Sequence, residues 1–177
     1  LGLDGSTVPR KARHVLPIAP VTDLITNGSF TGNITGWTGS APTGTATWSY
    51  DAGVYFDTAG SAKVALATGN DVGRLVSTAF STVVGEVYTI VLAIKTDGTS
   101  IDELSYIGLK PYVVDNGGAG SASPLITGFG YILNTVDIGS GTTEWQIFGW
   151  EFEATDDSYT LRIDIVNTLT SACNVWI

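Results

Sequence analysis

Short runs rich in Val, Ile, Thr, Tyr and Trp alternate with clusters of Gly, Ser, Asn and Asp from residue 23 to residue 177. In residues 161–165, Leu-Arg-Ile-Asp-Ile, apolar and charged side chains alternate strictly. Successive side chains of a strand point to opposite faces, so this run has one face toward a core and one toward water. No segment shows sustained helical periodicity. The pattern predicts an all-β protein, built as a sandwich or a barrel.

Turn clusters such as Asp97-Gly98 and Gly139-Ser140-Gly141 mark where the chain reverses. They separate the predicted strands, which cover residues 23–30, 44–50, 54–57, 63–67, 74–83, 87–94, 106–114, 131–136, 145–153, 159–166 and 174–177. The run at 87–94 is apolar on both faces, which predicts cover on both sides, by a long loop such as residues 115–130 or by a partner chain. We therefore expect one sandwich domain over residues 22–177.

Residues 1–21 have a different composition. They hold three prolines and a basic cluster, Arg10, Lys11, Arg13 and His14, with no regular period. Proline removes a backbone donor, so this segment is no central strand. It is predicted to be an extended, Pro-rich basic arm or linker. Two interpretations stay open: a disordered tail, or an arm that docks on neighbouring subunits of an assembly.

Charge and cysteine content exclude several classes of function. Residues 23–177 hold sixteen of the seventeen acidic residues but five of the eight basic ones, and the whole chain has a net charge of −9. Such a domain repels phosphate backbones, so we expect no nucleic-acid partner. No apolar run approaches the roughly 20 residues that span a bilayer. Cys173 is the single cysteine, which excludes an internal disulfide, and it is predicted to be a buried apolar residue.

Catalytic arrangements are hard to build from this sequence. The single histidine, His14, lies in the arm, away from any Ser or Cys that it could activate. Paired carboxylates can hydrolyse glycosidic bonds at separations of roughly 5–9 Å, and Glu151, Glu153 and Asp164 are the candidates. Acidic pairs on strands more often form a solvated face. The sequence therefore favours a protein that is not an enzyme.

Four short motifs carry a family resemblance. They are Asn27-Gly28-Ser29-Phe30, Gly36-Trp37, Thr143-Glu144-Trp145 and the terminal Val175-Trp176-Ile177. Together they resemble the first and last strands of the jelly-roll carbohydrate-binding modules of the xylanase/laminarinase type. The resemblance spans residues 22–177. It implies a two-sheet antiparallel β-sandwich, a jelly roll, without catalytic machinery, on an extracellular protein or on a virion.

The resemblance also implies a structural calcium ion beside the first and last strands. The candidate ligands here are the backbone carbonyls of Gly28 and Gly60 and the side chain of Thr31, which stands where the family usually has a glutamate. Calcium takes six to eight oxygens, several of them from carboxylates. Two anionic ligands of the family's set are missing from this sequence, so calcium and its absence both stay open.

In modules of this type the glycan lies in a cleft where aromatic rings stack on sugar faces. The cleft aromatic of the family falls near Gly73 here, and glycine cannot stack. The candidate replacements are aromatic and the candidate polar partners can hydrogen-bond to hydroxyls. These candidates are Tyr112, Phe129 and Tyr131 with Gln146, Arg162 and Asp164. For each aromatic residue, packing in a core or an interface is the alternative.

Two functions of different classes follow from these observations. The first is a surface module that binds a polysaccharide or a cell-surface glycan. The second is a structural component of an assembly, such as a phage fibre or a capsid decoration, in which the sandwich supplies subunit contacts, residues 1–21 tie it to its neighbours and a homo-oligomer is possible. The composition is rich in Gly, Ser and Thr and poor in Lys, which suits both.

Overall fold

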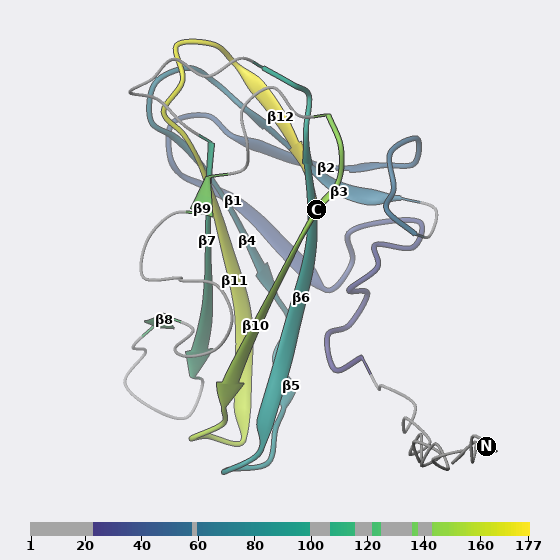
Figure 1. Ribbon diagram of the computed structural model, residues 1–177, viewed down its shortest axis with the longest axis vertical. Coiled ribbons are helices and arrows are strands. Elements are labelled where there is room, and N and C mark those ends of the chain that lie inside the picture. The colour runs from purple at the N-terminus through teal and green to yellow at the C-terminus, as the bar shows by residue number, and fades with distance from the viewer. Residues whose placement is uncertain (1–22, 58–59, 100–106, 116–121, 125–135, 138–142) are drawn as a thin grey trace, which may run out of the picture.

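Two antiparallel sheets are stacked face to face in the computed structural model of the protein (Figure 1). The structure describes residues 23–57, 60–99, 107–115, 122–124, 136–137 and 143–177. Within those ranges the regular secondary structure consists of strands. No helix in the described part of the chain is long and apolar enough to cross a membrane. The all-β sandwich predicted from the sequence is confirmed.

The first sheet has seven strands and carries the longest continuous pairing. Its main path runs β1-β4-β11-β7-β8, with β5 paired to β11 and β9 paired to β7. The strands are β1 (Trp37–Thr43), β4 (Asp71–Ser77), β5 (Phe80–Ser81), β7 (Ile107–Asp115), β8 (Ala122–Pro124), β9 (Val136–Asp137) and β11 (Ser158–Asn167). The central strand β11 is paired with β4 on one side and with β7 on the other.

The second sheet has five strands in the order β10-β6-β12-β3-β2. Its strands are β2 (Thr47–Asp51), β3 (Ser61–Leu66), β6 (Val87–Thr96), β10 (Gln146–Glu153) and β12 (Cys173–Trp176). Strand β6 pairs with the whole of β10 through its residues 87–94. It pairs with β12 only through Lys95 and Thr96.

The core lies between the inner faces of the two sheets. From the seven-stranded sheet it takes Leu75, Leu161, Ile163 and Ile165, each with no exposed surface. From the other sheet it takes alternate residues such as Ile90, Leu92 and Ile94 of β6 and Trp150 and Phe152 of β10. The face of β10 that carries Phe148, Trp150 and Phe152 is the inner one.

Two predicted strands are wrong, and the chain conformation explains one of them. Residues 23–30 form tight turns, because Asn27 and Phe30 have φ angles of 55° and 50°, far from the extended region. The Asn27 side chain holds this turn by donating to the carbonyls of Asn33 and Thr35 and accepting from the Thr31 amide. The first strand comes later, at β1. Residues 54–57 form bends rather than a strand.

The outer face of β6 has exposed apolar side chains. Val87 and Val91 are 61% and 63% exposed, and Ile147 beside them on β10 is 59% exposed. Most of the loop expected to cover this face, residues 116–121 and 125–130, lies outside the described residues, so cover by a loop stays a prediction, and so does cover by a partner chain.

A buried carboxylate fixes the corner between the sheets. Asp71 is 1% exposed, and it accepts hydrogen bonds from the backbone amides of Thr45, Ala46 and Ala67. Gly44 has a φ of 81°, and a Cβ atom there would lie 2.1 Å from an Asp71 oxygen. Glycine is needed at this position both for its left-handed conformation and for the close approach of the carboxylate.

Replacing Asp71 by alanine leaves three backbone donors without their acceptor. We expect Asp71→Ala to lower the free energy of unfolding by about 2–4 kcal/mol, because unsatisfied buried donors are costly. Urea denaturation measures this loss. Asp157→Ala is the matched control, since Asp157 is exposed, and it should change stability by less than about 0.5 kcal/mol. Equal losses in the two variants would contradict the role given to Asp71.

Candidate functional site

The outer face of the seven-stranded sheet carries a group of polar and aromatic side chains on β4, β11 and β7. Because Leu161, Ile163 and Ile165 point into the core, the residues between them point outward. In the strand register Asp164 lies opposite Arg74 of β4. Arg162 lies opposite Tyr112 of β7. The sheet thus brings together residues that are up to 90 positions apart in the sequence.

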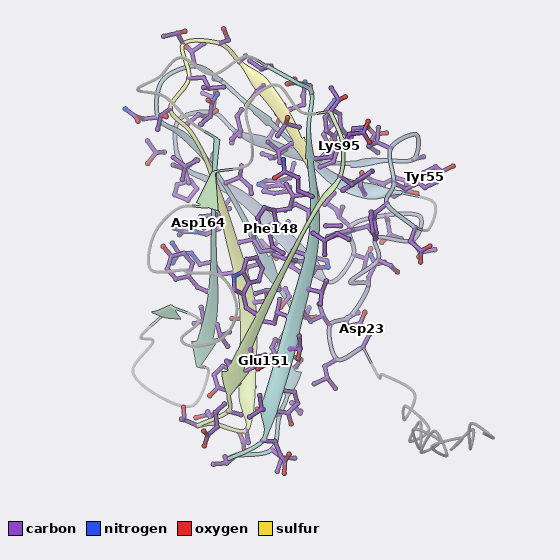
Figure 2. All side chains as sticks on the ribbon, viewed as in Figure 1. Asp23, Tyr55, Lys95, Phe148, Glu151 and Asp164 are labelled. Atoms are coloured by element: carbon purple, nitrogen blue, oxygen red, sulfur yellow. The ribbon has the colours of Figure 1, made fainter. Side chains whose placement is uncertain are left out.

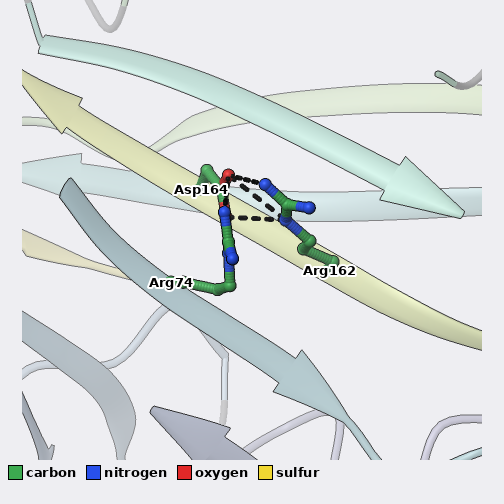
Figure 3. Close-up of polar contacts among 3 residues, drawn as sticks. All are labelled: Arg74, Arg162 and Asp164. Atoms are coloured by element: carbon green, nitrogen blue, oxygen red, sulfur yellow. Dashed lines mark hydrogen bonds and ion pairs between the residues drawn. The ribbon is translucent and has the colours of Figure 1, made fainter. Parts of the chain in front are cut away.

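Asp164 binds two arginines at once (Figure 3). Arg74 donates from Nε to Oδ1 at 2.8 Å and from Nη2 to Oδ2 at 3.0 Å. Arg162 donates from Nε to Oδ1 at 3.0 Å and also from Nη2 to Oδ2. The carboxylate side chain is 7% exposed, whereas the arginine side chains are 29% and 24% exposed. The Asp164 carboxylate is therefore nearly buried, whereas both arginine side chains can be reached from solvent.

The electrostatics keep this cluster fully ionised. Burial of the Asp164 carboxyl opposes its charged form, but hydrogen bonds from Arg162 and Arg74, together with their positive charges, outweigh burial and lower the pKa of Asp164 below the ordinary 3.8. The hydrogen bond to Asp164 raises the pKa of Arg74. With two guanidinium groups and one carboxylate, the cluster has a net charge of +1 on a protein whose overall charge is −9.

Tyr112 extends the cluster toward the edge of the sheet. The Arg162 guanidinium carbon lies 4.6 Å from the centre of the Tyr112 ring, a distance typical of cation–π contacts. Tyr112 is half-buried, and the next residue, Val113, is buried. The ring is thus held on the outer face by the inward packing of its neighbour and by the arginine beside it.

The structure brings together three of the six glycan-binding candidates: Tyr112, Arg162 and Asp164. It places Gln146 on β10, in the other sheet, so that residue is separated from the group. Phe129 and Tyr131 lie outside the described residues. None of these placements tests whether a glycan is bound.

Arg74 is a member of the cluster that the sequence analysis missed. The family resemblance drew attention to Gly73, but Gly73 is buried, and a Cβ there would lie 2.5 Å from Val64 in the core. The outward residue is the next one, Arg74. The alternation of Gly73, Arg74 and Leu75 was the available signal, since an inward Leu75 implies an outward Arg74.

The side chains of this face suit hydrogen bonding better than bond cleavage. Glu151 and Glu153 lie on β10, on the sheet opposite Asp164 (Figure 2), and Asp164 is committed to two arginines. Cys173 is buried in the core, as predicted. Burial raises the pKa of its thiol to about 12, so the nucleophilic thiolate is not formed at neutral pH.

Two of the three residues proposed as calcium ligands line one groove, and the third does not. Gly28 and Gly60 both line a groove beside β6, together with Asp23 and Asp57. Thr31 is not among the residues that line it, and its hydroxyl instead lies 3.3 Å from that of Ser29. Across the described ranges, no three His, Cys, Asp or Glu side chains gather as a metal-binding group. This donor set is poorer in carboxylates than calcium prefers, so calcium stays a prediction from the resemblance.

Solved structures with the same fold include several carbohydrate-binding modules. TmCBM61, solved in complex with β-1,4-galactotriose, matches with a TM-score of 0.58 at 12% identity, over 88% of this chain and 94% of that one. The CBM22-1 xylan-binding domain of Paenibacillus barcinonensis Xyn10C matches with a TM-score of 0.51 at 15% identity, over 83% and 85%. These likenesses confirm the jelly-roll fold that the sequence motifs predicted.

A phage protein shares the fold as well. The enzymatically active domain of tailspike protein 4 from bacteriophage CBA120 matches with a TM-score of 0.57 at 17% identity, over 86% of this chain and 20% of that chain. The present chain therefore corresponds to about a fifth of that tailspike domain. No protein-family model matches this sequence, and a search of curated proteins finds no match.

The Asp164 cluster should make the protein sensitive to acid. A carboxyl whose pKa is lowered by folding contributes stability above its unfolded pKa, and that contribution is lost as the pH falls through the folded value. We expect Asp164→Asn to lower the free energy of unfolding by about 1.5–3 kcal/mol at neutral pH, the range for hydrogen bonds to charged groups. Below the ordinary aspartate pKa of 3.8 the difference between variant and wild type should shrink. Denaturant titrations across this pH range measure it, and a difference independent of pH would contradict the assignment.

Proposed function

We propose that this protein is a non-catalytic β-sandwich module that binds a polysaccharide on the outer face of its seven-stranded sheet. The observation that carries the proposal is the cluster of Arg74, Arg162 and Asp164 beside Tyr112. Each arginine has five N–H donors, of which the contacts to Asp164 use Nε and Nη2. The remaining donors belong to side chains that are about a quarter exposed. They are available to sugar hydroxyls.

Rigidity favours this face as a binding surface. Asp164 holds both guanidinium groups in fixed planes, so little side-chain entropy is lost when a ligand is bound. The strands beneath are continuously paired from β1 to β7. An extended chain of sugars can lie across β4, β11 and β7 and meet the polar cluster and the Tyr112 ring in turn. Rings of this kind supply apolar area against a sugar face while the polar groups fix its orientation.

The structural neighbours support the same proposal. One was solved with a galactan trisaccharide and another is described as a xylan-binding domain. A module of this class acts on the outside of cells or virions, so we propose an extracellular or virion-surface location. Its partner is then a polysaccharide or a cell-surface glycan. Because the cluster has a net positive charge, the polysaccharides to be screened should include ones that carry anionic glucuronate as well as neutral ones.

Affinity gel electrophoresis tests the proposal with β-1,4-galactan, xylan, glucuronoxylan and β-glucan in the gel. We expect at least one polysaccharide to retard the wild-type protein. Tyr112→Ala and Arg162→Gln should each weaken that binding by about tenfold or more, a loss of about 1.4 kcal/mol. Gln146→Ala, on the other sheet, is the matched control and should bind like wild type.

Thermal unfolding of each variant shows whether a loss of binding is a loss of fold. If none of the polysaccharides retards the wild type, or if the control loses as much affinity as the two site variants, the proposed function is wrong.

A structural role in an assembly is the second candidate. It is favoured by exposed apolar side chains, namely Val83, Val84, Val87, Val91 and Ile147. Val87 and Val91 lie on β6 and Ile147 on the paired strand β10, and a contiguous apolar patch marks contact with other proteins. The similarity to a tailspike domain is compatible with this role. Light scattering of the full chain tests it, because a subunit of a homo-oligomer should show a multiple of 18.5 kDa, whereas a strictly monomeric mass counts against it.

A further inference from the structure

The outer face of the seven-stranded sheet holds three of the five basic residues found between residues 23 and 177. They are Arg74 on β4, Arg162 on β11 and Lys110 on β7, which stands opposite Asp164 in the strand register. Residues directly opposite each other on paired strands share a face of the sheet. On the described strands of this sheet, the acidic residues at outward positions are Asp164 and Asp137 of β9. Positive charge is therefore concentrated on one face of an acidic domain.

Both arginines of this face keep one edge of the guanidinium group free. Asp164 accepts hydrogen bonds from Nε and Nη2 of Arg74 and from Nε and Nη2 of Arg162. None of the hydrogen bonds among the described residues uses Nη1 of either arginine. An arginine has five N–H donors, so the edge between Nη1 and Nη2 keeps two of them. Each arginine can therefore bind a second acceptor without releasing Asp164.

The free edge of a guanidinium group fits a carboxylate better than a hydroxyl. Its two parallel N–H groups match the two oxygens of a carboxylate, and such charge-assisted hydrogen bonds are roughly twice as strong as neutral ones. A hydroxyl offers one oxygen and no charge. The single Asp164 carboxylate also balances the charge of only one of the two arginines that it holds. The free edges therefore favour an anionic acceptor.

The positions of these donors are set before a ligand binds. The Arg162 guanidinium is held by Asp164 and by the Tyr112 ring, whose centre lies 4.6 Å from the guanidinium carbon. Arg74 is held by two hydrogen bonds to the same carboxylate. Both arginine side chains are still about a quarter exposed. Because little side-chain entropy is left to lose, an anion can bind here at a small conformational cost.

The overall charge of the protein limits the kind of anion that suits this face. The chain has a net charge of −9. A polymer with a charge on every sugar would carry most of its charges outside the cluster, where the acidic surface repels them. A single carboxylate at the cluster interacts mainly with the two arginines, because exposed charges more than about 8 Å away are screened at physiological ionic strength. The charge distribution therefore favours a polysaccharide whose acidic sugars are separated by neutral ones.

We propose that Arg74 and Arg162 bind the carboxylate of an isolated uronate residue and so make this face select acidic over neutral polysaccharides. This inference rests on the function proposed above for the same face. The uronate carboxylate accepts hydrogen bonds from the free edges of the two guanidinium groups, while neutral sugars on either side lie along the strands. A sulfate ester shares the anionic chemistry of the carboxylate, so a sulfated polysaccharide is a separate ligand in the experiment.

Matched pairs of ligands isolate the contribution of the carboxylate. Glucuronoxylan and a glucuronate-bearing galactan are each compared with the same polymer after chemical reduction of its carboxyl groups to primary alcohols. Reduction removes the charge and keeps the sugar backbone. Isothermal titration calorimetry with the full chain measures the affinities. For the polymer that binds, we expect reduction to weaken binding by about tenfold or more, which corresponds to about 1.4 kcal/mol.

Substitutions separate the arginine cluster from the overall charge of the protein. Arg74→Gln should remove most of the preference for the unreduced polymer. Arg74→Lys keeps the positive charge but not the two parallel donors, so it should retain only a small part of that preference. Lys95→Gln, on β6 of the other sheet, removes one positive charge as Arg74→Gln does and should leave the preference unchanged. Thermal unfolding of each variant shows that it is folded.

Equal affinity for unreduced and reduced polymers, or an equal loss of preference in Lys95→Gln, would overturn this inference and leave the proposed function standing. Tighter binding to polygalacturonate, which has a charge on every sugar, would contradict the requirement for isolated uronates. Equal or tighter binding to a sulfated xylan would contradict the choice of a carboxylate. Binding to no polysaccharide at all would refute the proposed function, and this inference with it.

Discussion

The burial of alternate apolar side chains on β11 is the constraint on which the rest of this structure depends. Leu161, Ile163 and Ile165 are completely buried. Burial of apolar surface stabilises the folded state by about 25 cal/mol for each Å², so these side chains strongly favour the inner face. A slip of one residue would move all of them to solvent. The register is therefore fixed, and with it the outward direction of Arg162 and Asp164.

The ion cluster on that outer face is not explained by stability alone. Placing a nearly buried carboxylate on a sheet surface costs desolvation free energy, and apolar side chains of similar size are often as stabilising as such a pair. Here one Asp164 carboxylate holds two arginines that stay partly open to solvent. A group that is rigid, charged and accessible, with donors left over, is what recognition of a hydroxyl-rich ligand requires.

The outer faces of the two sheets carry different kinds of side chain. The seven-stranded sheet has a continuous set of paired strands beneath its polar cluster. The five-stranded sheet instead has exposed valines on the outer face of β6. The proposed glycan-binding face and the exposed valines of β6 therefore lie on different sheets.

Strand alternation made much of this fold predictable, and turn conformation limited the rest. The run at residues 161–165 predicted both the core face and the outward Arg162 and Asp164. The motif around Asn27 was expected to be a strand because its composition resembles one, yet a left-handed φ and a side-chain network make it a turn. Gln146 could not be placed by sequence, since its distance from Asp164 depends on which sheet takes β10. Arg74 joins the cluster through pairing with a strand 90 residues away, which local patterns do not contain.

The most direct test of the account is an NMR titration of the labelled protein with an oligosaccharide of the polysaccharide that retards it most. Binding at the outer face predicts chemical-shift changes concentrated in β4, β7 and β11, largest around Arg74, Tyr112 and Arg162, with β6 and β10 unaffected. Changes concentrated on β6 and β10, or no changes at saturating ligand, would contradict the central claim.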